Sequence, residues 1–298
     1  MTRPTRDTTA GRVYLDLRKK ARSEARGTDE LLVLYVLERF LYRLSISPYR
    51  NRFVLKGGML LAAFNERRPT RDVDLLGLAI TNDAEAVSAL IGEIAAIKVD
   101  DGVTFQPEQL TTHMIREQEV YAAVRVAMPA SLATAALALK VDVNVGDPVT
   151  PAPVEVTYPA LLDQPFTMVG YPLATVLAEK LVTMIARGDA TTRERDFADV
   201  WLLARRHPIG AGPLRDAMVA TADHRDVTLV RLSKVLSTLA TDRQDGWHRY
   251  ITRAGLDTDV PATLAEVIAD VLGFVDPLLD NALDPGAVWD PAARGWWR

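Results

Sequence analysis

Residues Lys56–Leu76 read "KGGMLLAAFNERRPTRDVDLL" and join a glycine pair to two aspartates that lie two positions apart. The apolar residues predict a short strand over 52–58, a helix that begins at the glycines and a second strand over 71–80. Successive side chains of a strand point to opposite faces, so Asp72 and Asp74 should project from the same face. Two carboxylates this close repel each other unless a cation lies between them, and Mg²⁺ prefers carboxylate oxygens. The stretch therefore predicts a metal-binding strand beside a glycine turn.

A third acid is expected on a later strand. Alternating valines predict a strand over 137–146, "LALKVDVNVG", and Asp142 lies within it. Burying this carboxylate without a partner would be costly, and three acids on adjacent strands can hold two metal ions. Gly57 and Gly58, at a strand-to-helix turn, can bring backbone N–H groups close to an anion. Such a site would activate an attacking hydroxyl and stabilise a leaving pyrophosphate.

The overall composition excludes several classes of protein. The chain has 298 residues, of which 48% are hydrophobic and 25% charged, as in ordinary globular proteins. Its formal net charge of −4 argues against binding nucleic acid by bulk charge, although a local basic face remains compatible. The absence of cysteine excludes disulfides and cysteine-based zinc sites. The N-terminus lacks the apolar core of a signal peptide and no stretch reads as a membrane span, so we expect a cytoplasmic protein.

The order of predicted elements indicates an α+β protein. We expect a mixed or antiparallel sheet flanked by helices, followed by a helical domain that completes the active site. The proline-rich segment 146–159 marks the change, and we place the domains at 1–155 and 156–298. The remaining predicted helices are 11–26, 29–45, 84–97, 171–188 and 194–207, with more to about 273; the remaining strands are 103–110 and 119–128, and the tail is a loop.

The order of these features resembles the DNA polymerase β-type nucleotidyltransferase superfamily. Its members share a glycine pair, a helix, an Asp-x-Asp strand and an aspartate on a later strand. Two further stretches, "LAEKLVTMIARG" (177–188) and "RERDFADVWLL" (193–203), are similar to later motifs of the AbiEii-like toxins. These are the nucleotidyltransferase toxins of type IV toxin–antitoxin systems, and they include the mycobacterial MenT group. The resemblance covers roughly residues 53–203.

The resemblance implies roles for the glycines and the first acids. Gly57 and Gly58 would hold the triphosphate of a nucleoside triphosphate. Asp72 and Asp74 would bind the metal ions. Asp142 would be the third metal-binding carboxylate and the base toward the attacking hydroxyl.

The resemblance also implies roles for residues of the later motifs. Lys180 would contact the nucleotide phosphates, and Asp199, with Asp196 near it, would be the late-motif acid. Helical spacing places Lys180, Thr183 and Arg187 on one face, where the two cations suit a triphosphate. Asp196 and Asp199 share a face of their own helix and could orient Lys180.

The resemblance implies a Mg²⁺-dependent toxin that transfers nucleotides to the 3′ end of tRNA. The added nucleotides would block aminoacylation and halt translation, and a cognate antitoxin would control the protein. Transfer to a protein side chain or a small molecule remains an alternative, as does a non-catalytic protein that only binds nucleotide. The pattern makes no prediction of the preferred nucleotide, the number added or the oligomeric state.

Some residues fit the resemblance less closely. Met59 follows the glycine pair where AbiEii-like members often carry Ser or Thr, so no hydroxyl is available there for a phosphate contact. The pair Trp296 and Trp297 is expected to pack the tail onto the body, and "ARRH" (204–207) to complement a helix dipole. Local basic surfaces for RNA would come from the run Arg18–Arg26, from Arg67, Arg68 and Arg71, and from Arg187, Arg193 and Arg195.

Overall fold

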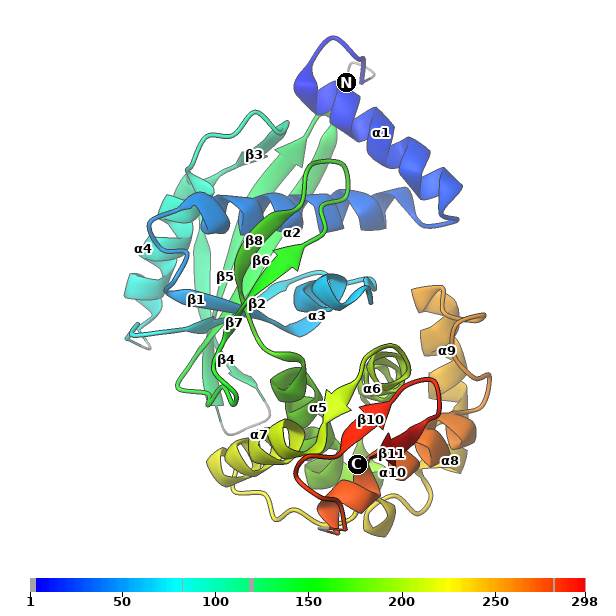
Figure 1. The fold of residues 1–298 in the computed structure, drawn as a ribbon. Helices are drawn as coiled ribbons and strands as arrows, with labels where there is room; N and C mark the ends of the chain where they lie inside the picture. Colours follow the sequence, from blue (N-terminus) through cyan, green and yellow to red (C-terminus); the bar gives the residue numbers. More distant parts are fainter. Residues whose placement is uncertain (1–3, 82, 118–120, 281, 298) are drawn as a thin grey trace. The chain divides into compact units, whose positions relative to one another are not determined.

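The computed structural model describes residues 4–81, 83–117, 121–280 and 282–297, and its chain forms two compact units. The sheet unit comprises Met1–Gly146 and Val154–Gly170, and the helical unit comprises Asp147–Pro153 and Tyr171–Arg298. The expected α+β class is confirmed, since a mixed sheet with flanking helices is followed by a mostly helical part (Figure 1).

The sheet unit is built on one sheet of eight strands. Seven of them lie in the order β3-β5-β6-β2-β1-β8-β7, and β4 pairs with the outer side of β5. The β2–β6 and β1–β8 pairs are parallel, and the other pairs of this sheet are antiparallel. The strands are β1 (Phe53–Lys56), β2 (Val73–Gly77), β3 (Val103–Phe105), β4 (Thr111–Glu117), β5 (Tyr121–Leu132), β6 (Ala135–Val145), β7 (Val154–Tyr158) and β8 (Phe166–Gly170).

Helices cover this sheet. The helix α2 (Thr28–Ile46) packs against β6 and β8, and α4 (Ala84–Ala95) packs against β4 and β5. α1 (Thr9–Ser23) lies against α2, and its N-cap residue Thr8 accepts a hydrogen bond from the Gly11 N–H. A short helix α3 (Gly57–Leu60) follows β1 directly and continues as a 3₁₀ turn, η1 (Leu61–Phe64). Another 3₁₀ turn, η2 (Pro107–Gln109), precedes β4.

The helix α2 also carries a group of buried charges. Arg43 forms an ion pair of 2.6 Å with Asp101, and both side chains are almost fully buried. Glu38 is fully buried and accepts hydrogen bonds from Arg39 and from the Leu161 N–H. Burial raises the pKa of Glu38 to about 7, although the positive charge of Arg39 opposes the shift.

The helical unit contains six helices among its described residues, together with a small antiparallel sheet. α5 packs against α6 and α7, and α10 packs against α6. The helices are α5 (Leu173–Arg187), α6 (Glu194–Arg206), α7 (Ala211–His224), α8 (Leu239–Asp242), α9 (Gln244–Ala254) and α10 (Leu264–Leu279). The 3₁₀ turns are η3 (Gly188–Ala190) and η4 (Leu232–Lys234), and the strands of the small sheet are β9 (Ile209–Gly210), β10 (Val288–Asp290) and β11 (Gly295–Trp297).

Three segments differ from the sequence predictions. The strand predicted over 103–110 ends at Phe105, because Pro107 begins a 3₁₀ turn, and β4 then follows where no strand was predicted. The segment 146–159 was predicted to be a boundary loop, but it contains β7, which pairs with β8. The tail forms the hairpin β10–β11 in place of a loop. Positions 119 and 120 of the strand predicted over 119–128 lie outside the described residues.

Within the described part of the chain, no helix has both the length and the apolar character that a bilayer span requires.

Candidate active site

Four charged residues form one row across the centre of the sheet. Lys56 on β1 lies opposite Asp74 on β2, and Asp74 lies opposite Asp142 on β6. Asp142 in turn lies opposite Arg125 on β5. Residues directly opposite each other on neighbouring strands point to the same face, so the row has two acids at its centre and one cation at each end. We call Lys56, Asp74, Asp142 and Arg125 the charged row.

Arg125 pairs closely with Asp142 and also lies near Asp72. Its Nε and Nη2 donate to the two oxygens of Asp142 at 2.7 and 2.6 Å, which is a bidentate pair. Its Nη2 also lies 3.9 Å from Asp72 Oδ2. The hydrogen bond to Asp142 raises the pKa of Arg125, and the negative charges of Asp142, Asp72 and Asp74 add to this effect. Arg125 was not predicted as a site residue, yet it is the cation that the three acids share.

Asp72 and Asp74 project from the same face of β2, as their spacing predicts. The alternate residues Val73 and Leu75 are fully buried on the other face. Asp72 lies just before β2, is about one-third exposed at 36% of its side chain, and accepts a hydrogen bond of 3.3 Å from Thr70. Asp142 is almost fully buried. The acids therefore differ in access, with Asp72 open to solvent and Asp142 enclosed.

The glycine turn lies directly against Asp74. Gly57 has a φ of 64°, in the left-handed region that favours glycine. A Cβ atom at Gly57 would lie 1.8 Å from Asp74 Oδ2 and 2.7 Å from Asp74 Cβ, so no larger residue fits. A Cβ atom at Gly58 would lie 2.7 Å from the Thr70 hydroxyl and 3.5 Å from Arg68 Nη2. The backbone of both glycines is thus held close to a carboxylate and to a guanidinium.

Met59 belongs to the core. Its side chain is buried, and its sulfur accepts a hydrogen bond of 3.9 Å from the hydroxyl of Tyr158. Burial raises the pKa of Tyr158, so the phenol stays protonated and can donate. The departure from the family pattern therefore replaces a hydroxyl with a packing residue.

In the helical unit, Lys180 is held by two carboxylates. Its Nζ donates to Asp196 Oδ1 at 3.0 Å and to Asp199 Oδ2 at 2.7 Å, and both aspartates are almost fully buried. Arg193 donates to the other oxygen of Asp196 at 2.6 Å. Burial alone would raise the pKa of Asp196, but the charges of Lys180 and Arg193 outweigh it and hold the pKa below the usual range. Asp196 and Asp199 orient Lys180, the arrangement that their shared helix face allowed.

Thr183 and Arg187, which share the helix face of Lys180, differ in burial and in their contacts. Thr183 is buried, donates to the Glu179 carbonyl and accepts a hydrogen bond of 3.0 Å from Arg225. Arg187 is exposed in the last turn of α5. Arg195 is exposed on α6, and Asp199 pairs with Lys180 instead of with it.

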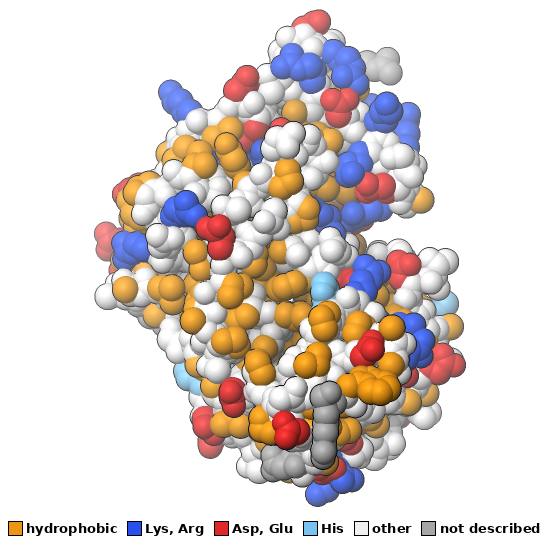
Figure 2. Space-filling view, viewed as in Figure 1, with side chains coloured by type: hydrophobic (Ala, Val, Ile, Leu, Met, Phe, Trp, Pro, Cys, Tyr) orange, Lys and Arg blue, Asp and Glu red, His pale blue; other side chains and the backbone are white. Residues whose placement is uncertain are grey.

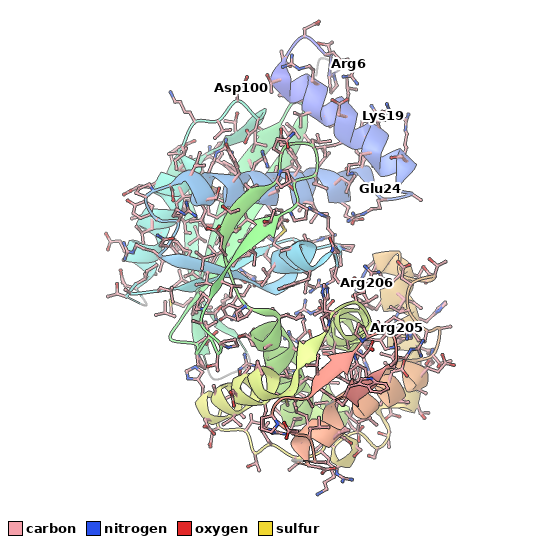
Figure 3. The ribbon with its side chains drawn as sticks, in the orientation of Figure 1. Arg6, Lys19, Glu24, Asp100, Arg205 and Arg206 are labelled. Atoms are coloured by element: carbon pink, nitrogen blue, oxygen red, sulfur yellow. The ribbon has the colours of Figure 1, made fainter. Side chains whose placement is uncertain are left out.

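The basic residues of the candidate RNA-binding surfaces differ in whether they already pair with other groups of the protein. Arg67 lies 3.5 Å from the buried Glu38 and donates to the Pro159 carbonyl, so it is a structural cation. Arg71 is exposed. In the run Arg18–Arg26, Lys20 pairs with Glu24 at 2.7 Å, while basic side chains gather around α1, where Arg6 and Lys19 are labelled (Figures 2 and 3).

The acids fit a magnesium ion that arrives with its substrate. Mg²⁺ is usually bound by one or two carboxylates together with substrate phosphates, and Asp72 and Asp74 supply such oxygens beside the glycine turn. Arg125 already engages both oxygens of Asp142. Across the described residues there is no group of three or more His, Cys, Asp or Glu side chains placed to hold a metal ion. The donor set therefore suits an ion shared with a phosphate more than one held by protein groups alone.

Comparison with known families decides the assignment. The family model described as "Nucleotidyl transferase AbiEii toxin, Type IV TA system" matches residues 39–278, which is most of the chain. The chain belongs to the AbiEii family of nucleotidyltransferase toxins. The matched range contains the charged row, the glycine turn, and Lys180 with Asp196 and Asp199. No curated protein gives a significant match.

Two solved structures match this chain. JHP933 from Helicobacter pylori is 15% identical, with a TM-score of 0.50, over 86% of this chain and 94% of the other. A second Helicobacter pylori protein, described as a candidate nucleotidyltransferase, is 16% identical with a TM-score of 0.49, over 86% of this chain and 97% of the other. At such identity the likeness to JHP933 shows a shared fold and nothing beyond the fold.

Proposed function

We propose that this AbiEii-family protein transfers a nucleotide from a nucleoside triphosphate to the 3′ end of tRNA in a Mg²⁺-dependent reaction. The observation that carries the proposal is the charged row beside the glycine turn. It gathers carboxylates on one face of the sheet, next to backbone that can approach a triphosphate. The modified tRNA would no longer accept an amino acid, so translation would stop, and a cognate antitoxin would control the protein in the cytoplasm.

The residues of the sheet unit would act as follows. The glycine turn binds the triphosphate through backbone N–H groups, and Arg68, whose guanidinium lies close to Gly58, adds positive charge. Asp72 and Asp74 would hold Mg²⁺, which when bound neutralises charge on the phosphates. The 3′-hydroxyl of the acceptor attacks the α-phosphorus, its proton passes to a carboxylate oxygen of Asp142, and pyrophosphate leaves. Arg125 fixes the orientation of Asp142.

The roles of residues in the helical unit rest on the family resemblance. Lys180 and Arg187 would contact the nucleotide phosphates, and this unit would complete the active site. Asp196 and Asp199 would position Lys180 through their hydrogen bonds of 3.0 and 2.7 Å. Transfer reactions of this kind are accelerated mainly by positioning and charge neutralisation, which suits groups held as firmly as these.

A labelling experiment tests the proposal. The protein is incubated with each α-labelled nucleoside triphosphate, Mg²⁺ and total cellular RNA, beside Asp72→Asn and the matched variant Asp100→Asn, an exposed aspartate of the same unit. We expect label on tRNA with the unaltered protein and with Asp100→Asn, and none with Asp72→Asn. Label on protein or on a small molecule would refute the tRNA acceptor, and absence of pyrophosphate release would refute the activity itself.

A further inference from the structure

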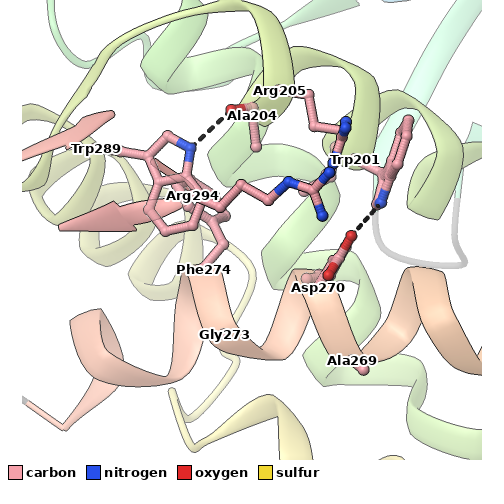
Figure 4. A pocket seen from close by; sticks show the side chains of 11 residues that line it. Trp201, Ala204, Arg205, Ala269, Asp270, Gly273, Phe274, Trp289 and Arg294 are labelled. Carbon is pink, nitrogen blue, oxygen red and sulfur yellow. Dashed lines mark hydrogen bonds between the residues drawn. The ribbon is translucent and has the colours of Figure 1, made fainter. Parts of the chain in front are cut away.

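A cavity of about 130 Å³ lies within the helical unit, outside the residues assigned to catalysis. Residues of α6, α10 and the β10–β11 hairpin line it (Figure 4). We call it the tryptophan pocket, after Trp201 on α6 and Trp289 on β10. Ligand pockets for whole cofactors are usually about 300–1,000 Å³, so this one has room for one part of a ligand, such as a single ring, and the rest of a larger ligand would lie outside it.

The tryptophan pocket has an excess of positive charge. Arg205 and Arg294 both point into it, and Asp270 is the one acid among the described lining residues (Figure 4). Asp270 already accepts a hydrogen bond of 2.8 Å from the indole N–H of Trp201. The Nη1 atom of Arg205 is buried and meets no hydrogen-bond partner within the described part of the chain. Burial and the nearby Arg294 both lower the pKa of Arg205. A bound anion would accept a hydrogen bond from Arg205 Nη1 and would offset the positive charges of Arg205 and Arg294.

The walls of the pocket are flat and firmly held. The guanidinium carbon of Arg205 lies 4.4 Å from the centre of the Trp201 ring. The indole N–H of Trp289 donates to the Ala204 carbonyl at 2.7 Å, and its ring meets Phe274 edge to face at 5.0 Å. The Arg205 guanidinium covers the Trp201 ring, so a planar group would stack on this guanidinium or pack against Trp289.

Gly273 keeps one side of the pocket open. It lies inside α10, where glycine weakens a helix, and its φ is not positive, so the backbone does not require glycine. A Cβ atom there would meet no atom within 4 Å. Neither the backbone conformation nor the packing therefore requires glycine at position 273. The absence of a side chain does leave space beside the two arginines.

We propose that the tryptophan pocket binds one unpaired nucleotide, with its base along the aromatic walls and its phosphate on Arg205 and Arg294. Guanidinium groups bind phosphate oxygens in a bidentate manner, and aromatic walls stack any base. An acidic side chain of a protein would satisfy the arginines but would leave the flat walls uncovered. The nucleotide comes either from a single-stranded RNA or from free nucleotide. This site does not depend on the catalytic assignment made above.

Binding measurements on the full chain test the proposal. Short unstructured oligonucleotides of adenylate or cytidylate, labelled with a fluorophore, are titrated in the presence of a chelator, which removes divalent metal from the sheet unit. Free adenosine and cytidine monophosphates form the second arm. We expect Arg205→Gln and Gly273→Leu each to weaken binding about tenfold or more, and Arg205→Gln to reduce the salt dependence by about one phosphate contact. Ala265→Leu, exposed on the same helix and outside the pocket, should leave binding unchanged.

Location is read separately by photo-crosslinking a thiouridine oligonucleotide and identifying the modified peptide. Crosslinks to the peptides of Trp201 or Trp289 support the proposal. Binding that none of the pocket variants alters would overturn it, as would a glutamate-rich peptide that binds the pocket while nucleotides do not. Competition by free monophosphates at equal affinity assigns the site to free nucleotide, and a preference for the oligonucleotide assigns it to RNA. If the unaltered protein binds nucleotide in the pocket but shows no transfer activity, only the catalytic proposal is refuted.

Discussion

The substitution Gly57→Ala tests whether close contact between the glycine turn and Asp74 is needed for catalysis. The added Cβ would lie 1.8 Å from Asp74 Oδ2, and ordinary contacts begin at 3.4 Å, so the carboxylate must move by 1.6 Å. Rotation of the Asp74 side chain cannot provide this shift, because the new atom would also lie 2.7 Å from Asp74 Cβ, which is fixed to the strand. Either the turn or β2 must therefore move.

The expected magnitudes follow from this geometry. Placing alanine at a φ of 64° costs roughly 1–2 kcal/mol in stability. A misplacement of about 1 Å in a catalytic site can reduce the rate about 10²-fold, which corresponds to about 2.7 kcal/mol of transition-state stabilisation. We expect Gly57→Ala to lose at least this much transfer activity while it remains folded.

Gly255→Ala provides the matched control. Gly255 ends α9 with a φ of 68°, and a Cβ atom there would meet nothing within 4 Å. Both variants therefore have the same backbone cost, and only Gly57→Ala displaces a carboxylate. Transfer of labelled nucleotide is measured for both, together with urea unfolding. The reasoning is refuted if Gly57→Ala and Gly255→Ala have the same transfer activity.

Three further predictions concern stability. Because the pKa of Glu38 is about 7 in the folded protein against an ordinary 4.5, ionisation of Glu38 in the unfolded state should remove about 3–4 kcal/mol of stability as pH rises from about 4.5 to 7, at about 1.4 kcal/mol per pKa unit; Glu38→Gln should flatten this fall in urea titrations at several pH values, and an unchanged slope would contradict it. Lys180→Met leaves two buried carboxylates without their shared cation and should lower the free energy of unfolding by about 3–5 kcal/mol, part of which a second change, Asp199→Asn, should restore. Gly273→Ala should raise the free energy of unfolding by about 0.5–1 kcal/mol, since its Cβ has space, and a loss of stability would show that the helix needs glycine.

The sequence predicted the acids of the site better than the cations. Alternation alone places Asp72 and Asp74 on one face, and the cost of burying Asp142 alone suggested a partner strand. Arg125 shares this signal, since it is the polar position between Val124 and Val126, which are both fully buried. β5 and β6 form a hairpin in which Leu132 lies opposite Ala135, but the strands predicted over 119–128 and 137–146 stop short of this turn and so did not give the register that places Arg125 opposite Asp142. The bidentate partner of Asp142 was therefore missed.

The segments missed in the fold have a similar cause. Val154–Tyr158 alternates between exposed and buried residues as a strand should, but its flanking prolines favour a turn. It becomes a strand because β8 pairs with it and with β1. In the tail, Trp296 stacks on Phe274 with ring centres 5.5 Å apart, as expected, whereas Trp297 is 60% exposed and the packing expected of it is wrong. The hairpin itself depends on pairing with β9, far along the chain.

The charged row explains how two aspartates can lie opposite each other on parallel strands. Like charges in this register destabilise a sheet, and Asp142 has almost no contact with solvent that could screen it. Lys56 and Arg125 flank the pair, so the row has no net charge in the protein alone. The two acids therefore have cationic neighbours within the protein itself, in contrast to the ligands of small zinc proteins, whose charges are balanced by the bound metal. A metal ion bound by Asp72 and Asp74 would act on the substrate. The acids of the row are stabilised by Lys56 and Arg125, which the sequence analysis did not assign to the site.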